Sequence, residues 1–160
     1  MTTIGITGHS SLSEPTIALV DKALRDALLP HANGDLVGVS CLARGADQIF
    51  AAAVLELGGM LDVVIPAADY VTGIREATSR ARVETLVARA RSVHQLPFRT
   101  SGPDAYLAGS KELIDRSELI FAVWDGGPAD GTGGTADAVS YAKRRKREIT
   151  VIWPVDAARL

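Results

Sequence analysis

Three glycine-bearing turns in this sequence could bind a phosphate group. They occupy residues 8–11, 43–47 and 125–134, and the last of them is followed by Thr135. Glycine lets backbone N–H groups approach a phosphate closely, and a helix that begins at such a turn adds the favourable end of its dipole. Where the three turns meet, we expect a nucleotide or phosphate site. For a single turn, the need for a tight bend is an equally good explanation.

Side chains in and beside these turns offer more specific contacts. Arg44 could clamp a phosphate through parallel hydrogen bonds, or it could simply pair with Asp47 on the surface. His9 could titrate or hydrogen-bond at the ligand, and Trp124 could stack on a base or pack in the core. The residues predicted to bind the ligand are Gly8, His9, Ser10, Ala43, Arg44, Gly45, Asp47, Trp124, Asp125, Gly133, Gly134 and Thr135.

Other kinds of site are disfavoured by the same residues. No Lys-Ser/Thr pair follows the glycines, and no clean G-x-G-x-x-G is present, which argues against a Walker A loop and ordinary NAD binding. The three histidines, at positions 9, 31 and 94, show no ligand spacing, so no metal site is predicted. We expect no cofactor other than a bound nucleotide or phosphate.

Short apolar runs alternate with segments of helical period along the chain. Strands are expected over residues 3–8, 36–42, 61–66, 92–97, 119–124 and 149–154. Helices are expected from near Pro15 to Leu28 and over residues 46–57, 75–91, 104–116 and 135–147. Each glycine-bearing turn therefore follows a predicted strand.

The strand pattern predicts the class of fold. Continuously apolar strands are typical of a parallel sheet covered on both faces, and their alternation with helices indicates right-handed βαβ units. We therefore predict an α/β, doubly wound, mainly parallel sheet flanked by helices (Rossmann-like), with residues 1–160 as a single domain. In such sheets ligands bind at the carboxyl ends of the strands, where the turns lie.

Composition excludes several classes of protein. The chain has 160 residues, of which 47% are hydrophobic and 22% charged, so it can bury a core and is not intrinsically disordered. Its single cysteine, Cys41, excludes an internal disulfide. No apolar run is long enough to span a bilayer, and the first residues do not resemble a signal peptide. A cytoplasmic protein without a membrane partner is predicted.

Charge is nearly balanced overall but unevenly distributed. Seventeen Lys and Arg residues oppose nineteen Asp and Glu residues, which gives a net charge of −2. Five cations form one basic block, residues 143–147, in what is predicted to be the last turn of a helix. Cations there complement the helix dipole, so nucleic acid is predicted to be an unlikely partner. The polar face carrying Arg75, Arg80 and Arg82 is likewise interpreted as solvated.

The helix predicted over residues 46–57 is apolar almost all round. A single covering layer of a sheet leaves one helix face in water, so this pattern predicts burial on both sides. We therefore expect the helix to lie in a subunit interface of a homodimer or larger homo-oligomer.

Two stretches resemble a known superfamily. Residues 40–47, SCLARGAD, look like the "SGLARGAD/ID" segment of the DprA/LOG-like, or SLOG, superfamily of Rossmann-like domains. Residues 111–125, KELIDRSELIFAVWD, followed by Gly133-Gly134-Thr135, are similar to its second half, in which a strand precedes a phosphate loop. The resemblance extends from Ile4 to Trp153 and implies a nucleotide or nucleotide-derived ligand.

The resemblance also implies alternatives for function. LOG members split a nucleoside monophosphate into base and ribose 5-phosphate, others are ligand sensors, and DNA-processing protein A binds single-stranded DNA. In the hydrolase pattern a glutamate stands three residues after the threonine of a Gly-Thr pair. With that pair aligned on Gly134-Thr135, Ala138 occupies the position of the glutamate, and Asp137 lies one residue earlier. Asp137 and Asp47 are therefore the candidate catalytic carboxylates, because N-glycosidic cleavage calls for a placed carboxylate.

Three functions follow in order of preference. The main prediction is binding of a nucleotide or nucleotide-derived ligand at the carboxyl edge of the sheet. The alternative is a nucleoside 5′-monophosphate phosphoribohydrolase of the LOG type, and the third is single-stranded nucleic-acid binding through the basic block.

Overall fold

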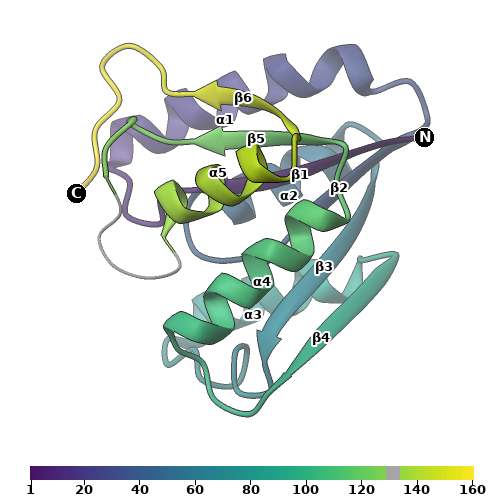
Figure 1. The fold of residues 1–160 in the computed structure, drawn as a ribbon, viewed down its shortest axis with the longest axis vertical. Helices are drawn as coiled ribbons and strands as arrows, with labels where there is room; N and C mark the ends of the chain where they lie inside the picture. The colour runs from purple at the N-terminus through teal and green to yellow at the C-terminus, as the bar shows by residue number, and fades with distance from the viewer. Residues whose placement is uncertain (129–133) are drawn as a thin grey trace.

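The computed structural model describes residues 1–128 and 134–160. Within these residues, strands and helices alternate along the chain (Figure 1). The strands are β1 (Thr2–Gly8), β2 (Leu36–Ser40), β3 (Met60–Ala67), β4 (Ser92–Phe98), β5 (Leu119–Val123) and β6 (Glu148–Ile152). The helices are α1 (Glu14–Leu28), the short 3-10 helix η1 (Leu29–His31), α2 (Ala46–Glu56), α3 (Ala77–Ala88), α4 (Pro103–Asp115) and α5 (Thr135–Arg144).

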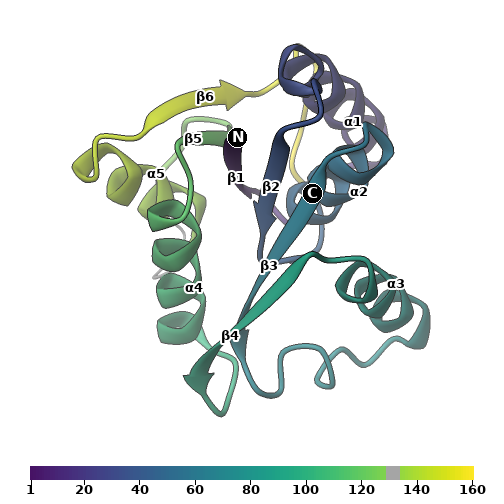
Figure 2. The ribbon, with the colours of Figure 1, turned by 90° about the vertical axis from the view of Figure 1, so that its right-hand side faces the viewer.

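All six strands form one parallel sheet. Their order is β4-β3-β2-β1-β5-β6, so the chain winds outward from β1 to β4 and then returns to the other side of β1. Helices α1, α2 and α3 cover one face of the sheet, and α4 and α5 cover the other (Figure 2). This confirms the predicted α/β, doubly wound fold. The direction of winding reverses between β1 and β5, which is where such sheets open a crevice.

Apolar side chains fill the space on both faces of the sheet. On the α1–α3 face, Phe50 of α2 meets Phe121 of β5 edge to face, with ring centroids 6.3 Å apart. On the other face, Leu113 and Ile114 of α4 pack in one buried cluster with Ala138 of α5. Helices therefore pack against the strands on both faces of the sheet, and this packing fixes the positions of the turns at the carboxyl ends of the strands.

Helix α2 is covered by neighbours from its own chain. It packs against α1 on one side and against β1, β2 and β3 on another (Figure 2). Phe50, Ala51, Ala53 and Val54 are fully buried there. Much of the apolar circumference of α2 is thus buried within a single chain, with Ile49, Ala52 and Leu55 only half-buried, and the homo-oligomer stays a prediction.

The helices differ from expectation mainly at their ends. Helix α3 covers Ala77–Ala88 rather than residues 75–91, because the chain turns into the helix only after Glu76 and leaves it at Arg89. Helix α5 ends at Arg144, so most of the basic block lies beyond it. None of the helices in the described part of the chain is both long and apolar enough to cross a membrane.

Candidate functional site

A cleft of about 830 Å³ opens at the carboxyl edge of the sheet. Its walls come from the turns after β1, β2, β3 and β5, together with residues of α3 and α4 and the start of α5. The predicted ligand residues that line it are Gly8, His9, Ser10, Ala43, Arg44, Asp47, Trp124, Gly134 and Thr135. The cleft therefore lies where the strand order places it, beside the reversal between β1 and β5.

The turn after β1 brings the sheet close to α2. A Cβ atom at Gly8 would lie 2.7 Å from Cβ of Ala46 and 2.8 Å from Cβ of Val123, so only glycine fits there. The backbone N–H of His9 donates to the carbonyl of Val123 at 3.0 Å, and Ala46 N donates to the carbonyl of His9 at 3.3 Å. These contacts tie the turn both to β5 and to the first residue of α2.

The ring of His9 is buried in this turn and joins it to the turn after β5. Its Nε2 accepts a hydrogen bond from Asp125 N at 3.1 Å and lies 3.2 Å from Oδ1 of the same residue. Trp153 packs against the ring edge to face at 5.5 Å. His9 thus lines the cleft while it holds two of the cleft's turns together.

The turn after β2 is held by side-chain hydrogen bonds. The hydroxyl of Ser40 donates to the carbonyl of Asp47 at 3.0 Å and accepts from Leu42 N at 3.0 Å. Leu42 has a φ of 58°, a conformation that a branched side chain adopts only when its surroundings impose it. Gly45 has a φ of 85°, and a Cβ there would lie 2.7 Å from the carbonyl oxygen of His9. Gly45 therefore serves close packing and does not line the cleft.

Asp47 lies at the buried floor of the cleft. Its Oδ2 accepts a hydrogen bond from Ala43 N at 3.3 Å, and its exposed fraction is 7%. Burial raises the pKa of this carboxyl from 3.8 to about 7, although the hydrogen bond from Ala43 works in the opposite direction. Near neutral pH Asp47 can thus both accept and donate a proton. Burial also raises the pKa of the neighbouring Cys41 thiol well above its usual value, so that this cysteine stays protonated.

Arginines supply the positive charge of the cleft. Arg44, Arg75, Arg82 and Arg159 all line it. Arg44, Arg75 and Arg82 are exposed, and the structure records no ion pair between any of them and another described residue. Arg80 behaves differently, because it donates to the carbonyl of Ile74 at 2.8 Å and lies 4.0 Å from Glu84. Arg75, which precedes α3, and Arg82 on α3 are exposed, which agrees with the predicted solvated face, and both side chains also line the cleft.

Some predicted residues lie outside the cleft. Asp125 does not line it; its carboxylate accepts from Gly127 N at 2.8 Å, and that hydrogen bond, with His9 and Arg159 nearby, lowers its pKa. Asp137 is half-buried in the first turn of α5 and does not line the cleft either. Gly133 falls outside the described residues. Of the two candidate catalytic carboxylates, only Asp47 faces the cleft.

An aromatic wall of the cleft was not predicted. Tyr70 and Tyr106 meet edge to face, with ring centroids 6.2 Å apart, and both line the cleft. Asp69 accepts from Ser101 N and from the Ser101 hydroxyl, both at 2.7 Å, and so fixes the turn after β4 beside this wall. Asp69 and Tyr70 lie two and three residues after the end of β3, and this position at a strand end is the sequence signal that points to them. Tyr106 lies inside α4 and carries no such signal.

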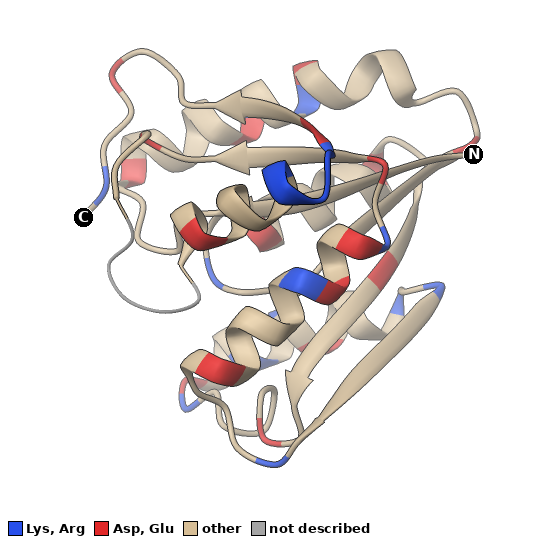
Figure 3. Ribbon diagram, in the orientation of Figure 1, with Lys and Arg blue, Asp and Glu red and all other residues tan. Residues whose placement is uncertain are grey.

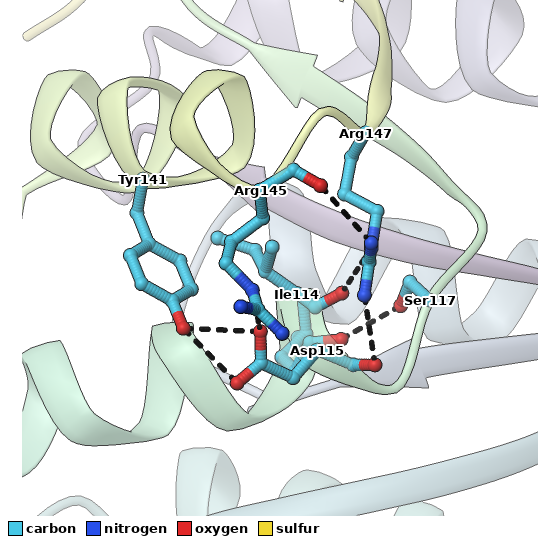
Figure 4. Close-up of polar contacts among 7 residues, drawn as sticks. Ile114, Asp115, Ser117, Tyr141, Arg145 and Arg147 are labelled. Carbon is cyan, nitrogen blue, oxygen red and sulfur yellow. Dashed lines mark hydrogen bonds and ion pairs between the residues drawn. The ribbon is translucent and has the colours of Figure 1, made fainter.

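The basic block lies far from the cleft. It occupies the C-terminal end of α5 and the turn into β6, where Figure 3 shows the chain in blue. The residues of α5 that line the cleft are at the other end of the helix, at Thr135 and Ala136. Arg147 donates to the carbonyls of Ile114, Asp115 and Arg145 at 3.1–3.2 Å, and Arg145 donates to Asp115 Oδ1 at 2.9 Å (Figure 4). Two of its cations therefore hold the end of α4, and Lys143, Arg144 and Lys146 are left exposed.

Solved structures with very different sequences share this fold. DNA processing protein A from Streptococcus pneumoniae is 17% identical with a TM-score of 0.68, over 98% of this chain and 52% of that chain. The same protein from Helicobacter pylori, in a structure concerned with its single-stranded DNA binding mode, is 16% identical with a TM-score of 0.69, over 99% of this chain and 68% of that chain. The molybdenum cofactor binding protein from Rippkaea orientalis is 12% identical with a TM-score of 0.60, over 96% and 77% of the two chains.

These similarities establish the fold. They confirm the Rossmann-like architecture that the resemblance to the SLOG superfamily implied, and this chain spans about half the length of the Streptococcus pneumoniae protein. No model of a known protein family matches the sequence, and no curated protein matches it.

The comparisons correct one prediction about partners. Nucleic acid was judged unlikely, yet two of the similar structures are of DNA processing protein A, one of them concerned with single-stranded DNA binding. The physical reason for the error is that a net charge of −2 and a basic block at a helix end say nothing of where the fold places the other cations. The fold gathers four arginines, Arg44, Arg75, Arg82 and Arg159, at the cleft.

Proposed function

We propose that the cleft binds a nucleotide or nucleotide-derived ligand through its phosphate groups. The observation that carries the proposal is the set of exposed arginines, Arg44, Arg75 and Arg82, that line the cleft without an ion pair to a described residue. An arginine guanidinium offers a planar fork of donors that matches phosphate oxygens. Three such groups around one hollow favour an anion with several oxygens.

Backbone groups support the same ligand. Helices α2 and α5 both begin beside the cleft, with Gly45 and Gly134 as their N-cap residues, which have no side chain to cap the helix. The first N–H of α2, that of Ala46, already donates to the carbonyl of His9, so the N–H groups that follow it are the ones a ligand would meet. The first N–H groups of a helix have no partner within the helix and carry a partial positive charge. A phosphate placed between these helix ends and Arg44 would satisfy both kinds of donor.

The remaining walls suit a nucleoside. Tyr70, Tyr106 and Trp124 offer apolar ring surface for a base. Trp124 is held in place by a hydrogen bond from its Nε1 to the carbonyl of Gly127 at 3.0 Å. Asp47 offers a carboxyl that can accept from or donate to a ribose hydroxyl or the edge of a base.

A thermal-shift and calorimetric screen with nucleoside mono-, di- and triphosphates tests the proposal. A ligand at a hundred times its dissociation constant should stabilise the fold by about 2.7 kcal/mol. We expect Arg44→Ala to weaken binding by at least tenfold, because a charge-assisted contact is worth about 1.5–3 kcal/mol. Arg89→Ala is the matched control, since Arg89 is exposed at the end of α3 and does not line the cleft. No binding by the unmodified protein, or equal loss in both variants, would refute the proposal.

Single-stranded DNA is the second candidate ligand for the same cleft. It is favoured by the shared fold with DNA processing protein A of Helicobacter pylori. Grooves that bind single strands combine cations with aromatic residues, as Arg44, Arg82 and Tyr70 do here. This function predicts affinity for an oligonucleotide that falls steeply with salt and is lost in Arg44→Ala. Loss of that affinity in Lys143→Ala/Arg144→Ala instead would place the DNA on the basic block.

A further inference from the structure

A second hollow adjoins the cleft on the outer side of α1 and α2. It also measures about 830 Å³ and lies between the first turns of these two helices, which run side by side on one face of the sheet (Figure 2). Ser10, Arg44, Gln48 and Arg82 line both hollows. Arg44 and Arg82 therefore stand on the boundary between the cleft and the second hollow.

The second hollow differs from the cleft in chemistry. Its floor is apolar, with Leu12, Ile17, Ile49 and Ala52 among its lining residues, and Ile17 is 39% exposed there although it is a large aliphatic side chain. Apolar surface of this kind at a rim of polar residues is typical of a binding site.

The charged groups of the second hollow limit what it can hold. Apart from the shared arginines, its charged side chains are Glu14 and Asp21, and Asp21 is already paired with Arg25 at 3.0 Å. An anionic group deep in this hollow would face Glu14. The hollow therefore suits an apolar ring that is neutral or positively charged.

We propose that the natural ligand is a two-part molecule joined by a diphosphate, such as a dinucleotide, with its parts on opposite sides of Arg44 and Arg82. This inference rests on the proposed nucleotide function and names its ligand class. The first nucleoside occupies the cleft, the diphosphate lies against the two arginines, and the second ring lies on the apolar floor between α1 and α2. Two guanidinium groups from different elements, the turn after β2 and helix α3, match two linked phosphates better than one.

The test compares matched ligands on the complete chain. Affinities of ADP, GDP, CDP and UDP are measured by calorimetry beside those of the corresponding dinucleoside diphosphates, in which two copies of the nucleoside share one diphosphate. The dinucleoside compound carries less negative charge than the nucleoside diphosphate, so tighter binding would not come from charge. We expect the best dinucleoside compound to bind at least about tenfold tighter, as burial of part of an aromatic ring would give.

Two variants of α1 locate the second part. Ala18 is exposed and lines the second hollow, so Ala18→Trp should fill the hollow without entering the core. We expect this variant to lose the tenfold gain and to bind the nucleoside diphosphate unchanged. Lys22→Trp places the same ring on an exposed position of α1 that does not line the hollow, and it should keep the gain.

Each outcome bears on one proposal. Nucleoside diphosphate binding with no gain for the dinucleoside compound, or a gain that survives in Ala18→Trp, would overturn the two-part ligand and leave the nucleotide function standing. An equal gain for a dinucleotide joined by a single 3′–5′ phosphate would overturn the diphosphate and favour a nucleic-acid strand. Absence of binding by every compound would instead remove the nucleotide function itself.

Discussion

The carboxylate of Asp47 accepts a hydrogen bond from the backbone N–H of Ala43, four residues earlier, across 3.3 Å at the floor of the cleft. This one contact does not compensate for burial, and the pKa of Asp47 is raised to about 7. In the unfolded chain the same carboxyl titrates near its ordinary value of 3.8. Asp47 is therefore a group that costs stability in order to keep an ionisable carboxyl at the cleft.

The first prediction concerns stability and pH. Because the pKa of Asp47 is higher in the folded state, its contribution is fully present below about pH 4 and is lost as the pH rises through about 7. The full loss is at most about 4 kcal/mol, at about 1.4 kcal/mol per unit of pKa. We expect Asp47→Asn to match the unmodified protein near pH 4 and to have a higher melting temperature at pH 8.

The readout is the difference between the two melting temperatures across this pH range. Other titrating groups affect both proteins equally, so they cancel in the difference. A difference that stays constant from pH 4 to pH 8 would show that Asp47 does not titrate in this window.

A second prediction concerns ligand affinity and pH. A nucleoside diphosphate brings negative charge to the cleft, so it binds better when Asp47 is protonated. We expect affinity to fall by about tenfold as the pH rises from 6 to 9, since a like charge a few ångströms away costs about 1–3 kcal/mol near a protein surface. Calorimetry on Asp47→Asn should show a flatter profile. Identical profiles for both proteins would mean that the dependence comes from the ligand alone.

Much of the fold was predictable from local patterns. Apolar runs identified all the strands of the sheet, and the strand ends located the turns that carry Gly8, Arg44 and Thr135. These features depend on residues close together in the sequence, so a pattern of a few residues is enough to reveal them.

The parts that were missed depend on tertiary placement. Arg82 and Tyr106 lie inside helices, and which face of a helix meets the cleft is decided by how that helix packs. Gly45 and Asp125 show the converse, because each lies in a turn at the expected edge but faces a neighbouring turn. Proximity to a strand end places a residue at the edge of the sheet, but it does not say whether the side chain faces the cleft or a neighbouring turn.

The third prediction concerns catalysis. Ala138 is buried in the core with Leu113 and Ile114, so no carboxylate occupies the position that the hydrolase pattern fills with glutamate. We expect no release of free base from nucleoside 5′-monophosphates, measured by chromatography after prolonged incubation. Base release that disappears in Asp47→Asn would contradict this expectation and would assign general acid–base chemistry to Asp47.

A fourth prediction tests the role of His9 as a tie between turns. His9→Ala removes the acceptor for Asp125 N and the ring that Trp153 contacts. Loss of a buried acceptor and of ring packing should lower the free energy of unfolding by about 2–4 kcal/mol. Urea denaturation measures the change, and His94→Ala is the control because His94 is exposed on β4. Similar small effects of both changes would show that His9 is not needed to hold the turns.

The last prediction separates two roles within the basic block. Arg147 donates to carbonyl groups at the end of α4, so Arg147→Ala leaves the carbonyls of Ile114 and Asp115 without this donor. We expect a loss of about 1–2 kcal/mol in the free energy of unfolding by urea denaturation. Lys143→Ala should change stability by less than about 0.5 kcal/mol, because Lys143 is exposed on the last turn of α5 and surface substitutions usually have small effects. Neither variant should alter nucleotide affinity, since the block lies at the other end of α5 from the cleft. Equal loss of stability in both variants would mean that the block acts only through its total charge.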